Sequence, residues 1–125
     1  MSECIVKEFW KCIDEFRFDD MGMLMHENAK VNLPNTCDVF YGAKEYVEFN
    51  KKYPGQWRIT VEKKCITKRT IVTAAKVTNE ESGVVFYVTS FFEISDGKIK
   101  EIIEYWGDKT EPPEWRIKAK GRRDE

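Results

Sequence analysis

The chain is poor in the residues from which metal and redox sites are usually built. It has 125 residues but only one histidine, His26, and its four cysteines include no CxxC pair. A site of the zinc type needs three or four such ligands at short spacings, so the sequence predicts no metal centre and no cofactor. We expect Cys4, Cys12, Cys37 and Cys65 to be reduced thiols, mostly buried in the core.

An excess of charge of one sign is also absent. The 21 lysines and arginines nearly balance the 22 aspartates and glutamates, which leaves a formal net charge of −1. Nucleic-acid binders usually carry a clearly basic surface, so no nucleic-acid partner is expected. No apolar run approaches the ~18 residues of a membrane span, and the N-terminus lacks a signal-peptide pattern. The sequence therefore predicts a cytoplasmic protein without a membrane partner.

Aromatic residues, by contrast, are plentiful at 14% of the chain, and many of them lie within residues 84–108. Two alternating apolar runs in this stretch flank Asp96-Gly97. Asp-Gly in such a setting favours a hairpin with a type I′ turn, in which both central residues need a positive φ. Both faces of this hairpin are apolar, so we expect the sheet that contains it to be covered on both sides.

The remaining predicted elements place helices before strands. Apolar spacings of three and four, with capping residues, predict helices, and alternation predicts strands. Helices are expected at residues 2–16, 19–28 and 43–53, the second one closing at His26, Glu27 and Asn28. Strands are expected at residues 30–33, 39–41, 56–67 and 70–78 and in the hairpin. This order indicates an α+β domain that ends in a four-stranded antiparallel meander.

The end of the chain differs in composition from the rest. Residues 109–125 are charged and interrupted by Pro112 and Pro113, with Trp115 as the only large ring. We expect a single domain over residues 1–116, with Trp115 docked on its body. Residues 117–125 are expected to form a charged, mobile tail.

Several short motifs, taken in order, resemble the NTF2-like superfamily and within it the SnoaL-like small bacterial proteins. They are AKVNLP at 29–34, Gly42 before a helix that contains Phe49, DGK at 96–98, YWGD at 105–108 and PEWR at 113–116. The resemblance covers roughly residues 6–116. It implies a cone in which N-terminal helices pack on a strongly curved, mainly antiparallel sheet and enclose a cavity. The outer face of the sheet commonly forms a dimer in this superfamily.

The strand period of two assigns the hairpin side chains to two faces. In steroid isomerases of this superfamily the aromatic position that matches Trp106 points into the cone, which implies the same direction here. The inward set is then Phe86, Val88, Ser90, Phe92, Ile102, Glu104 and Trp106. The outward set, Tyr87, Thr89, Phe91, Ile103 and Tyr105, is too apolar for a solvated face. We expect an isologous homodimer through it, or local cover by the tail.

Glu104 is the main candidate for chemistry. A carboxyl group between Trp106, Phe86 and Phe49 would be desolvated, which raises its pKa and makes it a usable acid or base near neutral pH. The alternative interpretation is that Glu104 pairs with an interior cation, Lys63 or Lys76, as a purely structural contact.

Ser90 and His26 are the candidate assisting residues. A buried strand serine also commonly bonds locally, and the only imidazole of the chain also suits a surface position at a helix end. Trp10 and Tyr46 are expected as core or cavity wall, and Asp108 as a turn cap or a residue of the cavity mouth. The predicted ligand-binding wall consists of Trp106, Phe86, Val88, Phe92, Phe49, Leu33 and Asn50.

The sequence departs from the steroid isomerases at their three catalytic positions. Leu33 stands at the position of the base, and Phe9 and Ser90 stand at the two positions of the oxyanion hole. Isomerisation of the standard steroid type is therefore not expected. One hypothesis is a cofactor-independent isomerase, cyclase, lyase or hydrolase that acts on a small apolar ligand by proton transfer, dehydration or cyclisation. The alternative is a non-catalytic small-molecule-binding or dimeric interaction module.

Overall fold

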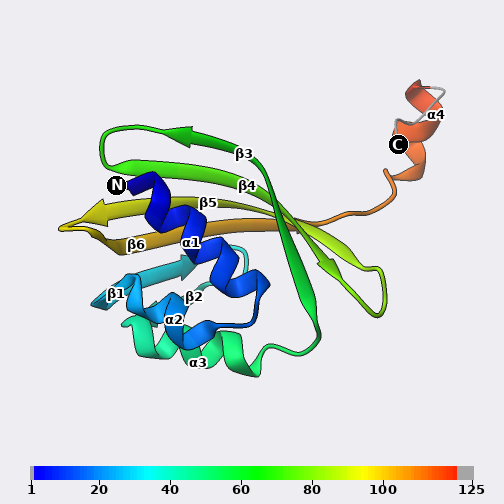
Figure 1. The fold of residues 1–125 in the computed structure, drawn as a ribbon. Coiled ribbons are helices and arrows are strands. Elements are labelled where there is room, and N and C mark those ends of the chain that lie inside the picture. Colours follow the sequence, from blue (N-terminus) through cyan, green and yellow to red (C-terminus); the bar gives the residue numbers. More distant parts are fainter. Residues whose placement is uncertain (1, 121–125) are drawn as a thin grey trace.

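The computed structural model describes residues 2–120 and shows three helices packed on one face of a curved, open sheet (Figure 1). The helices are α1 (Ser2–Asp14), α2 (Phe18–Met23), α3 (Ala43–Lys52) and α4 (Glu114–Lys120). The strands are β1 (Met25–Leu33), β2 (Asp38–Tyr41), β3 (Trp57–Ile66), β4 (Thr70–Asn79), β5 (Val85–Ser95) and β6 (Lys98–Asp108). The sheet order is β2-β1-β6-β5-β4-β3, and only β1 and β6 run parallel. This confirms the predicted α+β class with a mainly antiparallel sheet.

The β5–β6 hairpin forms as the sequence predicts. Asp96 and Gly97 have φ values of 50° and 76°, so both central residues of the turn are left-handed, as a type I′ turn requires. The strands pair from Ser95 with Lys98 outward, with one register shift next to Glu93. Past this shift the pairing is regular and places Ser90 directly opposite Glu104. The turn and the pairing together determine which face each side chain of the hairpin occupies.

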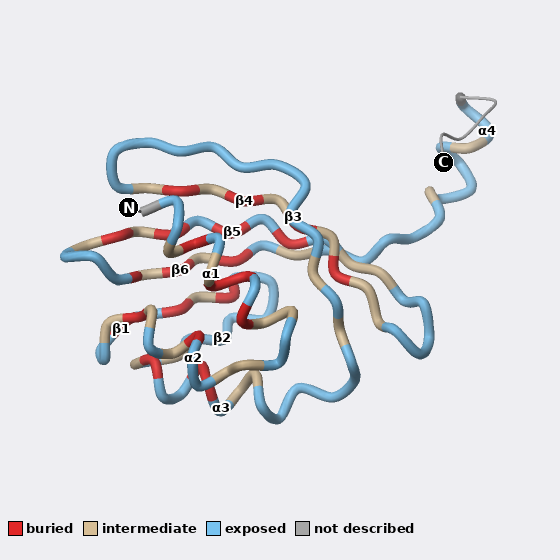
Figure 2. The backbone as a smooth tube through the Cα atoms, viewed as in Figure 1, coloured by how far each residue is buried: buried red, intermediate tan, exposed pale blue. Residues whose placement is uncertain are grey.

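The burial of the hairpin residues confirms the predicted assignment of its two faces. Val88, Ser90 and Phe92 are buried on β5, whereas Tyr87 and Phe91, at alternate positions, are 40% and 38% exposed. Figure 2 shows buried residues along β4, β5, β6 and β1, while β3 is exposed over most of its length. The buried face packs against α1, where Phe9 and Trp10 meet Phe92 edge to face, with ring centroids 5.1 and 6.0 Å away. The core therefore lies on the helix side of the sheet.

The second helix is shorter than predicted, and residues His26–Asn28 belong to β1 instead of closing it. The cause is a long-range contact that helix spacing does not reveal. The backbone N–H of Ile99 donates to the carbonyl of Leu24 at 2.9 Å, and Met25 pairs with Ile99 of β6. These bonds to the sheet end the helix, because tertiary pairing overrides a weak local preference.

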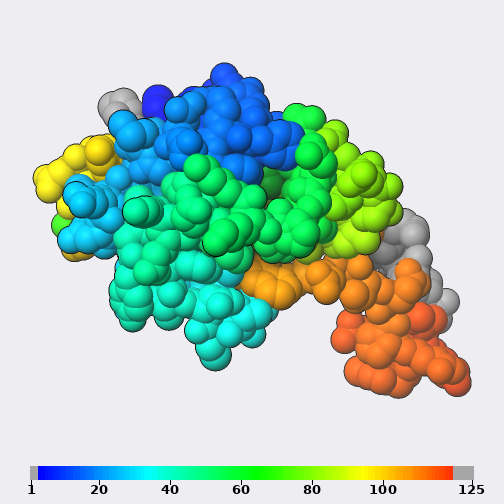
Figure 3. Space-filling model, turned by 90° about the horizontal axis from the view of Figure 1, so that it is seen from below, coloured from blue at the N-terminus to red at the C-terminus, as the bar shows by residue number. Residues whose placement is uncertain are grey.

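The predicted docking of Trp115 on the body is wrong. Its side chain is 68% exposed, and α4 stands off the domain in both Figures 1 and 3. Pro112 and Pro113 favour an extended backbone before α4. The guanidinium of the neighbouring Arg116 lies over the Trp115 ring, 5.6 Å from its centroid. The predicted mobile tail falls partly in α4, and residues 121–125 lie outside the described part. The described tail residues leave the outer sheet face uncovered.

Three of the four cysteines are exposed, which corrects the prediction of mostly buried thiols. Cys12, a residue of α1, is buried, but Cys4, Cys37 and Cys65 face solvent. Cys65 lies on the edge strand β3, and Cys37 has a φ of 63° in the turn before β2. Edge strands and turns leave their side chains accessible. Within residues 2–120 no helix has the length and apolar character needed to cross a membrane.

Candidate functional site

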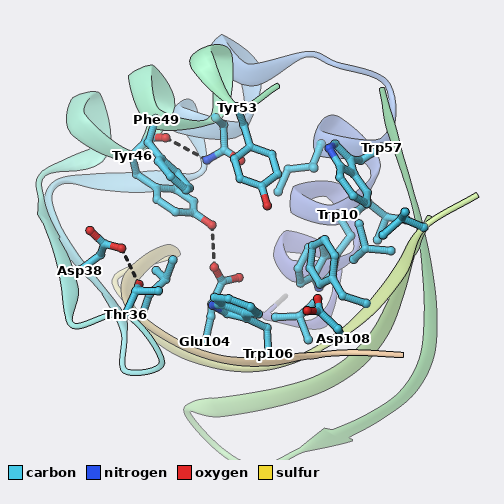
Figure 4. Close-up of a pocket in the computed structure, with 18 residues that line it drawn as sticks. Trp10, Thr36, Asp38, Tyr46, Phe49, Tyr53, Trp57, Glu104, Trp106 and Asp108 are labelled. Carbon is cyan, nitrogen blue, oxygen red and sulfur yellow. Dashed lines mark hydrogen bonds between the residues drawn. The ribbon is translucent and has the colours of Figure 1, made fainter. Parts of the chain in front are cut away.

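A cavity of about 340 Å³ lies between the helices and the inner face of the sheet (Figure 4). Its wall is made mainly of aromatic and aliphatic side chains from α1, α3, β3, β5 and β6. The size falls at the lower end of the range for pockets that hold small organic ligands. The cavity is therefore the candidate site.

Glu104 lies in the cavity wall with both carboxyl oxygens hydrogen-bonded. The Tyr46 hydroxyl donates to Oε1 at 2.8 Å, and the Ser90 hydroxyl donates to Oε2 at 3.1 Å. Glu104 is only 7% exposed, and Tyr46 and Ser90 are buried as well. Figure 4 shows the Tyr46 hydroxyl pointing down from α3 to the Glu104 carboxyl group on β6. A carboxyl group that is shielded from bulk water but touches a cavity can hold or release a proton there.

Gly42 determines where α3, and with it Tyr46, sits over the sheet. Gly42 has a φ of 96°, its N–H donates to the Ala29 carbonyl of β1 at 2.7 Å, and a Cβ there would lie 3.0 Å from the Glu27 carbonyl oxygen. Glycine adopts this conformation readily and permits this close approach. Tyr46 follows one helical turn later and therefore points back to the inner face of β6.

Burial controls the proton affinity of this pair. It raises the pKa of the Glu104 carboxyl above its ordinary value, and the hydrogen bonds from Tyr46 and Ser90 oppose that rise. Burial first, and then the nearby Glu104 charge, raise the pKa of Tyr46 well above its usual value. Tyr46 thus stays a neutral donor across the physiological range, and Glu104 is the group of the pair that can take up or release a proton.

The alternative in which Glu104 pairs with an interior lysine is wrong. Among the described residues Glu104 takes part in no salt bridge, and its partners are the two hydroxyls. Lys76 alternates with the buried Ala75 and Val77 and so faces the outer side of β4. Lys63 is exposed next to a register shift in β3. Neither lysine side chain could reach the cavity unless its strand were turned over to present the other face.

The pH dependence of stability should reveal the raised pKa of Glu104. The folded protein then binds a proton more tightly than the unfolded chain, whose carboxyl has a pKa near 4.5. Stability is expected to fall as pH rises through the window between the unfolded and folded pKa values, by at most about 1.4 kcal/mol per pH unit. Glu104→Gln lacks this group. The difference in free energy of unfolding, wild type minus variant, should decrease with pH in urea titrations. An increase would mean that the hydrogen bonds to the carboxylate outweigh burial.

The structure brings together most of the predicted wall but not all the predicted site residues. Phe92 is completely buried in the core and does not reach the cavity. Ser90 donates a hydrogen bond to Glu104 but is not one of the residues that line the cavity. His26 lies at the start of β1, where its Nε2 is 2.5 Å from the Ser95 carbonyl oxygen, and it is not brought to Glu104. The predicted residues that do line the cavity are Trp106, Phe86, Val88, Phe49, Leu33 and Asn50.

Sequence reasoning missed the most important partner of Glu104. Tyr46 was predicted only as core or wall, although it is the hydroxyl donor of the α3 face. Its main-chain carbonyl also accepts a hydrogen bond from the Asn50 amide at 2.8 Å. A tyrosine on an otherwise apolar helix face is a usable signal, because a buried phenol needs a polar partner. Asp38, Tyr53, Trp57 and Asp108 also line the cavity. No group of three or more described His, Cys, Asp or Glu residues converges as a metal site.

Comparisons with solved structures show the same fold in several proteins. A candidate ketosteroid isomerase from Kribbella flavida superposes with a TM-score of 0.80 at 22% identity, over 88% of this chain and 80% of that one. An NTF2-like protein of unknown function from Burkholderia xenovorans has a TM-score of 0.80 at 19% identity, over 93% and 90%. An LEH-like epoxide hydrolase from M. tuberculosis has a TM-score of 0.71 at 15% identity, over 82% and 80%. These likenesses show the NTF2-like fold and no more.

The sequence itself matches one family. No curated protein gives a significant match. The profile of the SnoaL-like domain, however, matches residues 6–102, which include most of α1, all of α2 and α3, the first five strands and the start of β6. The chain therefore belongs to the SnoaL-like domain family.

Proposed function

We propose that the protein binds a small, largely apolar molecule in the cavity and catalyses proton transfer on it, with Glu104 as the acid or base. The observation that supports this most directly is a buried carboxyl group in the cavity wall, held by two hydroxyl donors. Dehydration, isomerisation and cyclisation all need such a proton transfer and no cofactor. The reaction would then be that of a cofactor-independent isomerase, cyclase or lyase.

The geometry leaves Glu104 able to act while it is held in place. Each carboxylate oxygen accepts one hydrogen bond and keeps a further lone pair. Glu104 would remove a proton from the ligand to become the neutral acid, and would return a proton at another atom of the ligand. Tyr46 and Ser90 would stabilise the carboxylate form and fix its rotamer. They are positioning residues, because they act through Glu104.

The comparisons are consistent with this proposal without identifying the reaction. Proteins described as a candidate ketosteroid isomerase and an LEH-like epoxide hydrolase share the fold. This chain does not repeat the steroid isomerase residues. Leu33 lines the cavity where that base would stand, and Phe9 is buried in the core away from it. A different substrate class is therefore proposed.

A second candidate function is binding without turnover. The same two hydrogen bonds that hold Glu104 for proton transfer would also anchor it as a fixed acceptor for a ligand hydroxyl or amine. The large share of aromatic wall supports binding in either case. The two functions differ only in whether the protein chemically converts the bound molecule before it is released.

Native mass spectrometry of freshly purified protein tests the binding step. We expect a fraction of the protein to carry a co-purifying apolar molecule that is lost on denaturation. A Val88→Trp variant, which fills the cavity from β5, should not carry it, whereas Thr89→Val on the outer face should. An unloaded wild type that also binds no member of an apolar compound library, measured by tryptophan fluorescence, would contradict the proposal.

We also propose that two copies pair through the outer face of β4, β5 and β6. Tyr87, Phe91 and Tyr105 are 38–48% exposed there, and the Phe91 and Tyr105 rings meet edge to face at 6.1 Å. Helices cover only the opposite face (Figure 1). An isologous dimer would bury this apolar surface against itself.

The mass in solution tests the dimer. Light scattering of the wild type is expected to give twice the chain mass of 14.8 kDa, and Tyr105→Lys should give the monomer because it places like charges in the apolar contact. Tyr41→Lys, an exposed tyrosine on the edge strand β2, is the matched control and should remain dimeric. A monomeric wild type would refute this contact.

A further inference from the structure

The charged side chains of the cavity are all of one sign. Among residues 2–120, three charged residues line it, Asp38, Glu104 and Asp108, and no lysine, arginine or histidine of that range does. The chain as a whole has almost equal numbers of acidic and basic residues, so this is not a consequence of composition. Among the described residues none of the three carboxylates takes part in a salt bridge; Asp38 accepts a hydrogen bond from Thr36. A cleft lined by one sign of charge attracts ligands of the opposite sign.

The rings of the cavity form a continuous arc. Successive ring centroids are 5.3–6.3 Å apart from α3 across β3 and β5 to β6. The arc consists of Tyr46, Phe49, Tyr53, Trp57, Phe86 and Trp106. It closes through Glu104, which bonds to Tyr46 and lies two residues before Trp106 on β6. Figure 4 shows the labelled rings around a common central space.

Such a ring arrangement favours organic cations. The face of an aromatic ring carries partial negative charge, so an ammonium group that lies over a ring face, within about 6 Å of the ring centre, is attracted to that ring. Anionic ligands would meet both the ring faces and three carboxylates. An inorganic cation would need converging oxygen ligands, and no such group of three is present among the described residues.

We infer that the natural ligand of the cavity carries a protonated or quaternary amine beside its apolar body. This inference rests on the proposed function and specifies its ligand class. Asp38 and Asp108 are exposed and Glu104 is buried, which places the first two at the mouth and the third deep in the wall. The ammonium group would lie between the mouth carboxylates and the ring faces. The apolar remainder would then extend inward, so that Glu104 acts on a carbon or oxygen away from the amine.

The position of Tyr53 supports this placement of the amine. Its ring belongs to the arc, and burial, followed by the charge of Asp108, raises the pKa of its hydroxyl. Asp108 is thus close enough for its field to act inside the cavity. An ammonium group there would face a carboxylate and a ring at once, which is the combination that discriminates most strongly against a neutral analogue.

Three probes of matched shape and different charge test the inference. They are benzyltrimethylammonium, its neutral carbon analogue neopentylbenzene, and the anion phenylmethanesulfonate. Binding is followed by fluorescence of the cavity tryptophans in the full-length chain carrying Trp115→Phe, which removes the ring outside the cavity. We expect the cation to bind about tenfold more tightly than the neutral probe. The anion should not bind.

The outcomes separate the inference from the proposed function. Equal or weaker binding of the cation relative to neopentylbenzene would overturn the inference and leave an apolar site in place. Failure of all three probes would overturn both. The double variant Asp38→Asn/Asp108→Asn should reduce the advantage of the cation about threefold, because the aromatic arc remains, and should leave the affinity for neopentylbenzene unchanged. The control Asp96→Asn/Glu101→Gln removes the same charge outside the cavity and should leave all three affinities unchanged.

Discussion

The Glu104→Gln variant is expected to fold, to bind the natural ligand with unchanged affinity and to lose turnover by about a hundredfold to ten-thousandfold. Glutamine has the same shape as glutamate, and its amide can accept from the Tyr46 hydroxyl and donate to the Ser90 oxygen, so the hydrogen bonds of the site survive. What disappears is the group that can take up and release a proton. The measurement is conversion of the molecule recovered from the wild type, followed by chromatography with mass detection.

Co-purification gives an independent readout of the same variant. If the wild type turns the ligand over, Glu104→Gln should carry the substrate and the wild type the product. Glu101→Gln is the matched control, since it lies on the same strand outside the cavity. Full activity in Glu104→Gln would remove the acid–base role and leave the binding-only function.

The largest loss of stability is expected from Phe92→Ala, at about 3–5 kcal/mol. The Phe92 side chain is completely buried and contacts both Phe9 and Trp10, so its removal leaves a void between α1 and β5 that rigid neighbours cannot fill. Trp10 also donates to the Thr73 hydroxyl at 3.0 Å, which limits how far it can shift. Urea unfolding followed by circular dichroism measures the change.

Phe91→Ala is an unusually close control, because it is the same residue type one position away on the opposite face. Phe91 is 38% exposed, and its loss should cost about 1 kcal/mol or less in the monomer. Comparison at one fixed low protein concentration separates this from any effect on dimer formation. Similar losses for the two variants would mean that the two faces of β5 are equally buried in solution.

The β5–β6 hairpin could be predicted in detail from the sequence, because the period of two is a local signal, whereas the length of β1 and its parallel pairing with β6 could not. Asp96-Gly97 fixed the turn, and alternation then placed Ser90 and Glu104 on one face and Phe91 and Tyr105 on the other. The end of α2 could not be predicted in this way. It depends on the pairing of Met25 with Ile99, two residues far apart in the sequence. Whether Trp115 packs on the domain likewise depends on the direction that the chain takes after Pro113.

The site was predictable only in part, and for a comparable reason. Glu104 could be identified as a desolvated carboxyl from its strand neighbours alone. Tyr46 could be recognised only as a buried phenol that needs a polar partner, because the contact with Glu104 itself requires α3 to lie over β6, which the close approach of Gly42 to β1 determines. Phe92 was assigned to the cavity because alternation along β5 shows on which face of the sheet a side chain lies. It does not show how deeply that side chain is packed in the core. The sequence shows which face a side chain occupies, whereas packing of α1 decides whether that position is open or filled.

The parallel pairing of β1 with β6 has a consequence for synthesis on the ribosome. The first three helices and the β1–β2 hairpin emerge first, but one edge of β1 has no partner until the last strand of the sheet has been made. The nascent chain therefore exposes an unpaired strand edge and an open apolar face during most of translation. A domain whose sheet is completed by pairing two strands that are far apart in the sequence folds late. It avoids aggregation only if this last pairing follows synthesis quickly. For this chain, elongation past Asp108 is the step that first allows the whole cone to form.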